Sequence, residues 1–191
     1  MTLHKIASLA LAVVLLLAGM AMGRAISEEL DELWGADITV RELLSRVSPD
    51  LLGEFPVESY DLAVLWGKDR GRAICRSEES PAGLGSEIWY ECARLAYQVD
   101  TFAFEFFAYT STTAAVPYLR VLVYLQEDYA TKDMAQDACY TCFDVFAVGI
   151  NFDCHGERYR ALSYHWITFP TGYEPPGAFV VGRSNWVQRW D

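Results

Sequence analysis

The chain has 191 residues, of which 52% are hydrophobic and 14% aromatic, and this composition excludes an intrinsically disordered protein. Its formal net charge at pH 7 is −11, so contact with nucleic acid or with an anionic lipid surface would bring like charges together, and we exclude both as partners. A negative charge of this size is compatible with high solubility or with a basic protein partner.

The first 25 residues have the pattern of a secretory signal peptide. Lys5 precedes an apolar run from Ile6 to Ala18, and small residues follow at Gly23 and Ala25. The run has 13 residues, whereas a membrane-spanning helix needs about 20. We therefore expect residues 1–25 to be a signal peptide and the rest, residues 26–191, to be one secreted or periplasmic domain. An uncleaved N-terminal segment is the alternative. Only in that case do we expect the chain to contact a membrane.

Residues 27–56 predict two short helices. Ser27 is a suitable N-cap for the first helix, and Thr39 is one for the second, with Glu42 at the spacing of a capping box. The acidic residues of the first helix could suggest a metal site, but no calcium-binding loop pattern accompanies them, so we interpret them as a solvated face. These residues are Glu28, Glu29, Asp31 and Glu32.

The next part of the chain predicts two strands and a third helix. Residues 60–76 have the pattern of two strands joined by a polar turn, and a loop rich in Ser, Pro and Gly follows them. Residues 86–100 predict a helix, because Ile88, Cys92, Leu95 and Val99 recur at helical spacing.

The middle of the chain predicts an antiparallel hairpin. Residues 118–129 alternate between apolar and polar side chains, as a half-buried strand does. Residues 101–112 are apolar on both faces, as in a central strand, and residues 110–117 are expected to form the turn between the two.

The C-terminal third predicts one more helix and two strands. Residues 132–148 place an apolar stripe at helical spacing, and Gly149 is expected to end that helix. Residues 158–169 and 178–190 predict strands on either side of a turn. The predicted fold class is α+β, a single domain with a mainly antiparallel sheet, helices packed on one face and disulfide staples.

Three of the five cysteines and one histidine lie within residues 137–155. A redox pair at Cys139 and Cys142 is disfavoured, because a polar helical run precedes both residues and places them in mid-helix. A zinc site is disfavoured, because Cys154 and His155 are adjacent and diverge. We expect no metal and no cofactor. In an oxidising compartment we expect disulfides instead, with Cys154 bonded to Cys142 or Cys139.

The remaining cysteines complete this scheme of disulfides. We expect Cys75 to pair with Cys92, which leaves one buried thiol, assigned to Cys139. The candidate disulfide residues are therefore Cys75, Cys92, Cys142 and Cys154.

The alternative function is a small extracytoplasmic Cys-His hydrolase, with His165 as the base and Cys139 or Cys142 as the nucleophile. The order of these residues is similar to that in NlpC/P60-type peptidases, but the cysteine does not begin a helix and the interval to His165 is short, so we assign no family. Ser163 is not expected to serve as the nucleophile, because residues two apart on a strand lie about 7 Å apart.

The near-neutral C-terminal part is rich in Trp and Arg, which are residue types that dominate binding hot spots. These candidate binding residues are Trp166, Trp186, Trp190, Arg183 and Arg189. The leading interpretation is therefore a binding protein of the inhibitor, immunity or recognition type. It would have an acidic surface and a basic protein partner, and binding is favoured over catalysis.

Overall fold

The computed structural model describes residues 28–67, 70–75, 87–93, 97–100, 103–152 and 158–188. Strands make up 63% of it and helices 15%, and the strands form one curled, mixed sheet. The predicted α+β class, with helices packed on one face of the sheet, is therefore wrong: the protein is mostly β. The expected signal peptide lies outside the described residues. Among the helices that are described, none is long and apolar enough to span a membrane.

The N-terminal part of the described chain is helical. Residues 28–33 form a short helix, and α2 (Val40–Val47) follows with the predicted capping box between Thr39 and Glu42. The backbone N–H and the hydroxyl of Thr39 both donate to the Glu42 carboxylate, which lowers the pKa of Glu42. Two single turns, η1 (Pro49–Leu51) and η2 (Val57–Ser59), complete this segment.

Ten strands follow. Their order in the sheet is β1-β9-β7-β5-β3-β2-β8, with β10 beside β7 and with β4 and β6 beside β5. All pairs are antiparallel except β1 with β9. The strands are β1 (Val64–Trp66), β2 (Arg70–Cys75), β3 (Glu87–Ala93), β4 (Tyr97–Asp100), β5 (Ala103–Glu127), β6 (Ala130–Asn151), β7 (Arg158–Thr168), β8 (Tyr173–Glu174), β9 (Gly177–Arg183) and β10 (Val187–Gln188).

Two of the predicted helices are strands. The segment 86–100 contains β3 and β4, and the segment 132–148 lies inside the 22-residue strand β6. Gly149, expected to end a helix, lies opposite Phe106 on the neighbouring strand. A Cβ atom at Gly149 would lie 2.3 Å from the Phe106 ring, so glycine is required there for the ring to pack over the strand.

The predicted hairpin between residues 101–112 and 118–129 is also wrong, because residues 103–112 and 118–127 belong to the single strand β5. The hairpin is instead formed by β5 and β6 around Asp128 and Tyr129, which both have positive φ, as a tight two-residue hairpin turn requires. Residues 112–115 form an irregularity in β5 opposite Phe143, at which the register with β6 shifts.

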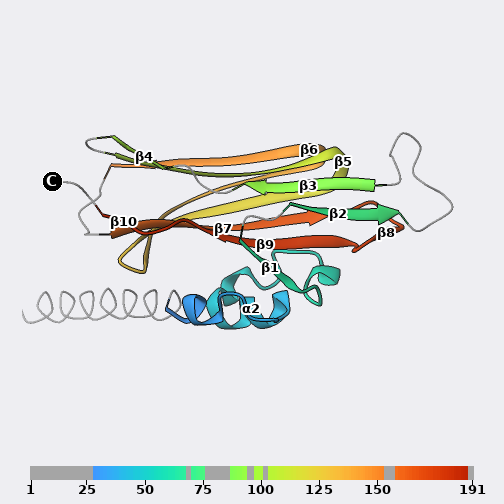
Figure 1. The fold of residues 1–191 in the computed structure, drawn as a ribbon, viewed down its shortest axis with the longest axis horizontal. Coiled ribbons are helices and arrows are strands. Elements are labelled where there is room, and N and C mark those ends of the chain that lie inside the picture. The colour runs from blue at the N-terminus through green and yellow to red at the C-terminus, as the bar shows by residue number, and fades with distance from the viewer. Residues whose placement is uncertain are drawn as a thin grey trace, which may run out of the picture.

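The long β5–β6 hairpin bends at this irregularity, so that the sheet has two layers (Figure 1). The upper layer consists of β3, β4, residues 103–112 and residues 143–151. The lower layer contains β1, β7, β9, β10 and the other halves of β5 and β6. The predicted strands at 158–169 and 178–190 are confirmed as the antiparallel pair β7–β9.

Two hydrophobic clusters hold these parts together. One lies between the two layers and joins residues such as Phe106 of the upper layer to Val121 and Val180 of the lower layer. The other contains the buried residues of α2, among them Leu43, together with residues such as Tyr164 on the outer face of the lower layer. The outer face of the lower layer is thus covered by the N-terminal segment, which lies below it in Figure 1.

Candidate interaction surface

Trp166, the first of the predicted binding residues, is buried. Its side chain is 2% exposed, its indole N–H donates to Thr168 Oγ1 at 2.9 Å, and its ring packs near those of Phe55 and Phe179. It therefore presents no open surface to a protein partner. Arg189 and Trp190 lie outside the described residues.

Trp186 and Arg183 are used largely inside the fold. Trp186 packs edge-on against Tyr129, with ring centroids 4.8 Å apart, and the guanidinium of Arg160 lies 4.5 Å from the Trp186 ring. Arg183 donates to Asp31 and lies 4.0 Å from the Trp34 ring centroid. The contact between Arg183 and Trp34 joins β9 to the N-terminal segment, and the contact between Arg160 and Trp186 joins β7 to the residues that follow β9.

Asp31 is the centre of this network. Arg160 Nη1 lies 2.8 and 2.9 Å from the two oxygens of Asp31, and Arg160 Nε donates to Gln126 at 2.7 Å. The Arg160 side chain is 2% exposed, and burial lowers its pKa, whereas the bonds to Asp31 raise it. The prediction of a solvated face for Asp31 is wrong, and the sequence carries no local signal for this role, because Arg160 is 129 residues away.

His165 lies in the core between the two layers. Its Nδ1 is 2.8 Å from Thr110 Oγ1 of the upper layer, and its Nε2 is 2.9 Å from Ser163 Oγ. The sequence-based distance of about 7 Å therefore does not describe the side chains of Ser163 and His165, which turn toward each other. His165 is 1% exposed and the two hydroxyl residues are fully buried, so this chain of polar groups connects the layers.

A disulfide joins Cys139 to Cys142, with the Cα atoms 6.1 Å apart. A disulfide is thus present, but its pairing differs from the expected bond of Cys154 to Cys142 or Cys139. Cys139, expected as the remaining thiol, is oxidised. Cys92 is buried, whereas Cys154 and the side chain of Cys75 lie outside the described residues.

The backbone explains how the disulfide forms inside a strand. Side chains three residues apart on a regular strand point to opposite faces. Thr141, between the two cysteines, has a φ of 53°, which interrupts the alternation and brings both sulfurs to the same side. The disulfide lies where the sheet bends between its layers, and its presence is compatible with an extracytoplasmic location.

The clearest exposed apolar surface lies on the outer face of the upper layer. Phe146, Val148 and Ile150 alternate along β6 with exposed fractions of 50%, 45% and 52%, while Val145 and Ala147 point into the core. Phe107 and Tyr109 of β5 lie opposite Val148 and Phe146, and the rings of Phe107 and Phe146 are 5.5 Å apart. We call these five residues, Phe107, Tyr109, Phe146, Val148 and Ile150, the β6 face.

The strand segments that carry the β6 face have acidic charges only. Residues 103–112 and 143–151 contain Glu105 and Asp144 and no Lys or Arg. Among the described strands, β6 pairs with β5 alone, so its other edge lies at the margin of the sheet.

Other kinds of site find little support in the part of the chain that the structure describes. There, no group of three or more His, Cys, Asp or Glu side chains is placed to hold a metal ion.

Comparison of the chain with protein-family models, with curated proteins and with solved structures finds no match.

Proposed function

We propose that this protein is an extracytoplasmic interaction protein, of the inhibitor, immunity or recognition type, that binds a basic protein partner through the β6 face. One observation carries the proposal. An exposed apolar row lies on two strand segments, residues 103–112 and 143–151, whose charged residues are both acidic.

The apolar row would supply binding free energy. Monomeric proteins rarely expose contiguous apolar patches larger than a few hundred Å², and such large patches commonly mark contact sites. Aromatic residues such as Phe146 and Phe107 lose little side-chain entropy on binding and are frequent at the centres of interfaces. The β6 face therefore has the composition of an interface core.

The acidic border would select the partner. Glu105 lies opposite Ile150, and Asp144 lies two residues before Phe146. Carboxylates at the rim of an interface attract a positively charged partner and accelerate its association. A second copy of this chain would place these carboxylates against one another, which favours a different, basic protein over a homodimer.

The hydrolase alternative finds no specific support among the described residues. Cys139 and Cys142 are bonded to each other, so neither presents a thiolate, and His165 is buried with hydroxyl groups at both ring nitrogens.

The test is capture followed by measurement of affinity. Immobilised protein is exposed to extracytoplasmic extract, and each captured protein is purified and titrated. It is titrated against the wild type and against the triple variant Phe146→Ser/Val148→Ser/Ile150→Ser. We expect a basic partner, with affinity at least about tenfold weaker for the triple variant and association that slows as salt increases.

The variant Val57→Ser is the matched control, because Val57 is 76% exposed but lies in η2 on the other side of the sheet. It should bind the partner as the wild type does. Equal affinity for the triple variant, an acidic partner, or a homodimer in sedimentation experiments would each overturn the proposal.

A further inference from the structure

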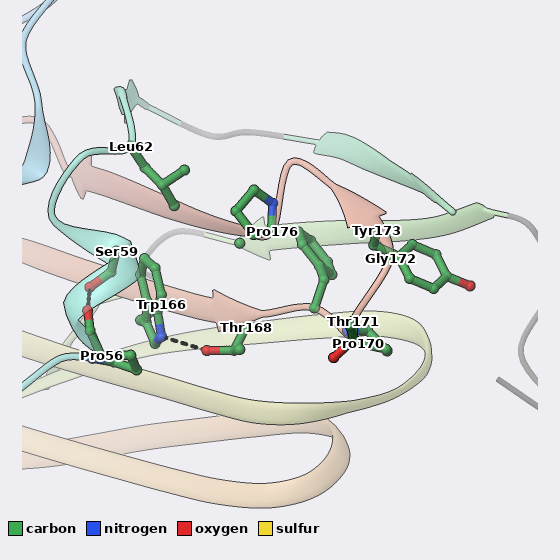
Figure 2. A pocket seen from close by; sticks show the side chains of 12 residues that line it. Pro56, Ser59, Leu62, Trp166, Thr168, Pro170, Thr171, Gly172, Tyr173 and Pro176 are labelled. Carbon is green, nitrogen blue, oxygen red and sulfur yellow. Dashed lines mark hydrogen bonds between the residues drawn. The ribbon is translucent and has the colours of Figure 1, made fainter. Parts of the chain in front are cut away.

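A cavity of about 310 Å³ lies between η2 and the turn that joins β7 to β9, and the lining is shown in Figure 2. It opens on the helical side of the lower layer, whereas the β6 face belongs to the upper layer. Its lining residues are Pro56, Ser59, Leu62, Trp166, Thr168, Phe169, Pro170, Thr171, Gly172, Tyr173, Pro176 and Gly177.

We propose that this cavity binds a small, uncharged, bicyclic aromatic compound between η2 and the turn that joins β7 to β9. This inference is independent of the proposed protein–protein contact, because the two sites share no residue. It rests on the charge, the size and the rigidity of the cavity.

The lining excludes a charged ligand. None of the twelve lining residues carries a charge, although 21% of the chain is charged, and half of the lining residues are aromatic or proline. A charged group transferred from water into these surroundings would lose its hydration without gaining an ionic partner. A neutral ring system loses little hydration and gains apolar contact.

The size selects a bicyclic compound. Benzene fits an apolar cavity of about 150 Å³, and this cavity has about twice that volume. It lies at the lower end of the range for small-molecule sites, which begins near 300 Å³. A single ring would leave half of the cavity unfilled.

The cavity is largely pre-formed, because its central ring is fixed. The indole N–H of Trp166 is bonded to Thr168, as Figure 2 shows, and its ring passes close to Gly177. A Cβ atom at Gly177 would lie 2.6 Å from the Ile167 carbonyl oxygen and 3.2 Å from the Trp166 ring, so only glycine permits this approach. A cavity whose walls are fixed in this way loses little entropy when a ligand enters it.

Among the hydroxyl groups of the lining, those of Thr168 and Thr171 are suited to bond a ligand. Thr168 Oγ1 accepts from the Trp166 indole, so its own hydroxyl proton remains to be donated. Thr171 lies at the exposed rim of the cavity. A ligand with one hydroxyl or carbonyl oxygen on its ring system would match this arrangement.

The probe is 2-naphthol, which is neutral at pH 7, compared with naphthalene-2-sulfonate, which has the same rings and a negative charge. Calorimetric titration of the full protein should show one saturable site for 2-naphthol and at least tenfold weaker binding of the sulfonate. Absence of saturable 2-naphthol binding, or equal binding of the two compounds, overturns the proposal.

Three variants locate the site. Thr171→Trp narrows the cavity from its exposed rim and should weaken 2-naphthol binding at least tenfold, while Thr131→Trp, on an exposed position of β6, should leave it unchanged. The β6-face triple variant should also bind 2-naphthol as the wild type does. Unchanged binding by Thr171→Trp, or loss of binding in the triple variant alone, overturns the assignment to this cavity. Neither result bears on the protein partner, so the two proposals fail separately.

Discussion

The side-chain amide of Asn151 donates a hydrogen bond to the carboxylate of Asp133, at 3.0 Å, although both residues belong to the same strand, β6. They are 18 residues apart, and a straight strand would separate them by about 60 Å. The strand therefore folds back on itself. Residue 142 is midway between them, and there the Cys139–Cys142 disulfide and the positive φ of Thr141 mark the bend.

The partner strand bends at the same level. Residues 112–115 of β5 face the single residue Phe143 of β6, and Thr112 Oγ1 donates to the Ala114 and Phe143 carbonyl oxygens. Extra residues on one strand of a pair increase its curvature. The bulge in β5 and the disulfide in β6 together set the angle between the two layers.

Removing the disulfide should destabilise the fold. For so short a loop, the chain-entropy model gives a loss of about 2 kcal/mol in the free energy of unfolding for Cys139→Ala/Cys142→Ala. Urea denaturation measures this loss, with Asp137→Asn as a control at an exposed position of the same strand. A double variant as stable as the wild type would show that the backbone alone maintains the bend.

Loss of the Asp31 charge should lower the free energy of unfolding by more than loss of the disulfide does. Asp31→Asn leaves the buried guanidinium of Arg160 without its carboxylate, and a buried ion pair broken on one side costs about 3–5 kcal/mol. Asp61→Asn is the matched control, because Asp61 is 84% exposed and pairs with Arg41 at the surface, where such a pair is worth about 1 kcal/mol or less. Equal losses for the two variants in chemical denaturation would refute a central role for Asp31.

The link between the layers at His165 can be tested with an isosteric change. Thr110→Val keeps the volume of the side chain but removes the hydroxyl that meets His165 Nδ1, and a buried polar atom deprived of a hydrogen bond costs about 1–3 kcal/mol. Thr131→Val, at an exposed position, should change the stability by less than about 0.5 kcal/mol. Thermal denaturation of both variants gives the comparison, and a Thr110→Val variant with wild-type stability would contradict a structural role for this contact.

The sequence was sufficient where one local pattern decided the structure. The capping box at Thr39 and Glu42 located α2, and a turn rich in Pro and Gly separated the two segments that form β7 and β9. In these segments, neighbouring residues alone specify the conformation.

The sequence misled where both faces of a strand are apolar. In β6 the inward Val145 and Ala147 alternate with the outward Phe146 and Val148, so the period of two disappears from the hydrophobicity pattern. The spacing of Cys139, Cys142 and Phe146 then resembles a helical stripe. The exposed apolar residues that concealed the strand are the ones that make the proposed interaction surface.

The Asp31 network could not have been predicted, for a different reason. Its three charged members, Asp31, Arg160 and Arg183, come from the N-terminal helix and from two strands more than 120 residues later. No local pattern specifies such a contact, because the tertiary fold alone brings the groups together.

Alkaline pH should weaken the fold through Tyr164. Burial disfavours the phenolate and raises the pKa of Tyr164 to about 12, compared with about 10 in an unfolded chain. Between these two values the folded state holds a proton that the unfolded state has lost. Stability is therefore complete below pH 10 and declines as the pH approaches 12, by about 1.4 kcal/mol per pH unit for this group.

The variant Tyr164→Phe should remove this contribution, so that its free energy of unfolding declines less steeply than that of the wild type between pH 10 and pH 12. The control is Ser48→Ala, because Ser48 lies 3.3 Å from the Tyr164 hydroxyl. This change removes the same hydrogen bond but keeps the phenol, so it should retain the wild-type slope. Urea denaturation at a series of pH values measures all three proteins. Equal slopes for the wild type and Tyr164→Phe would mean that Tyr164 ionises alike in both states, which its burial against α2 and the sheet argues against.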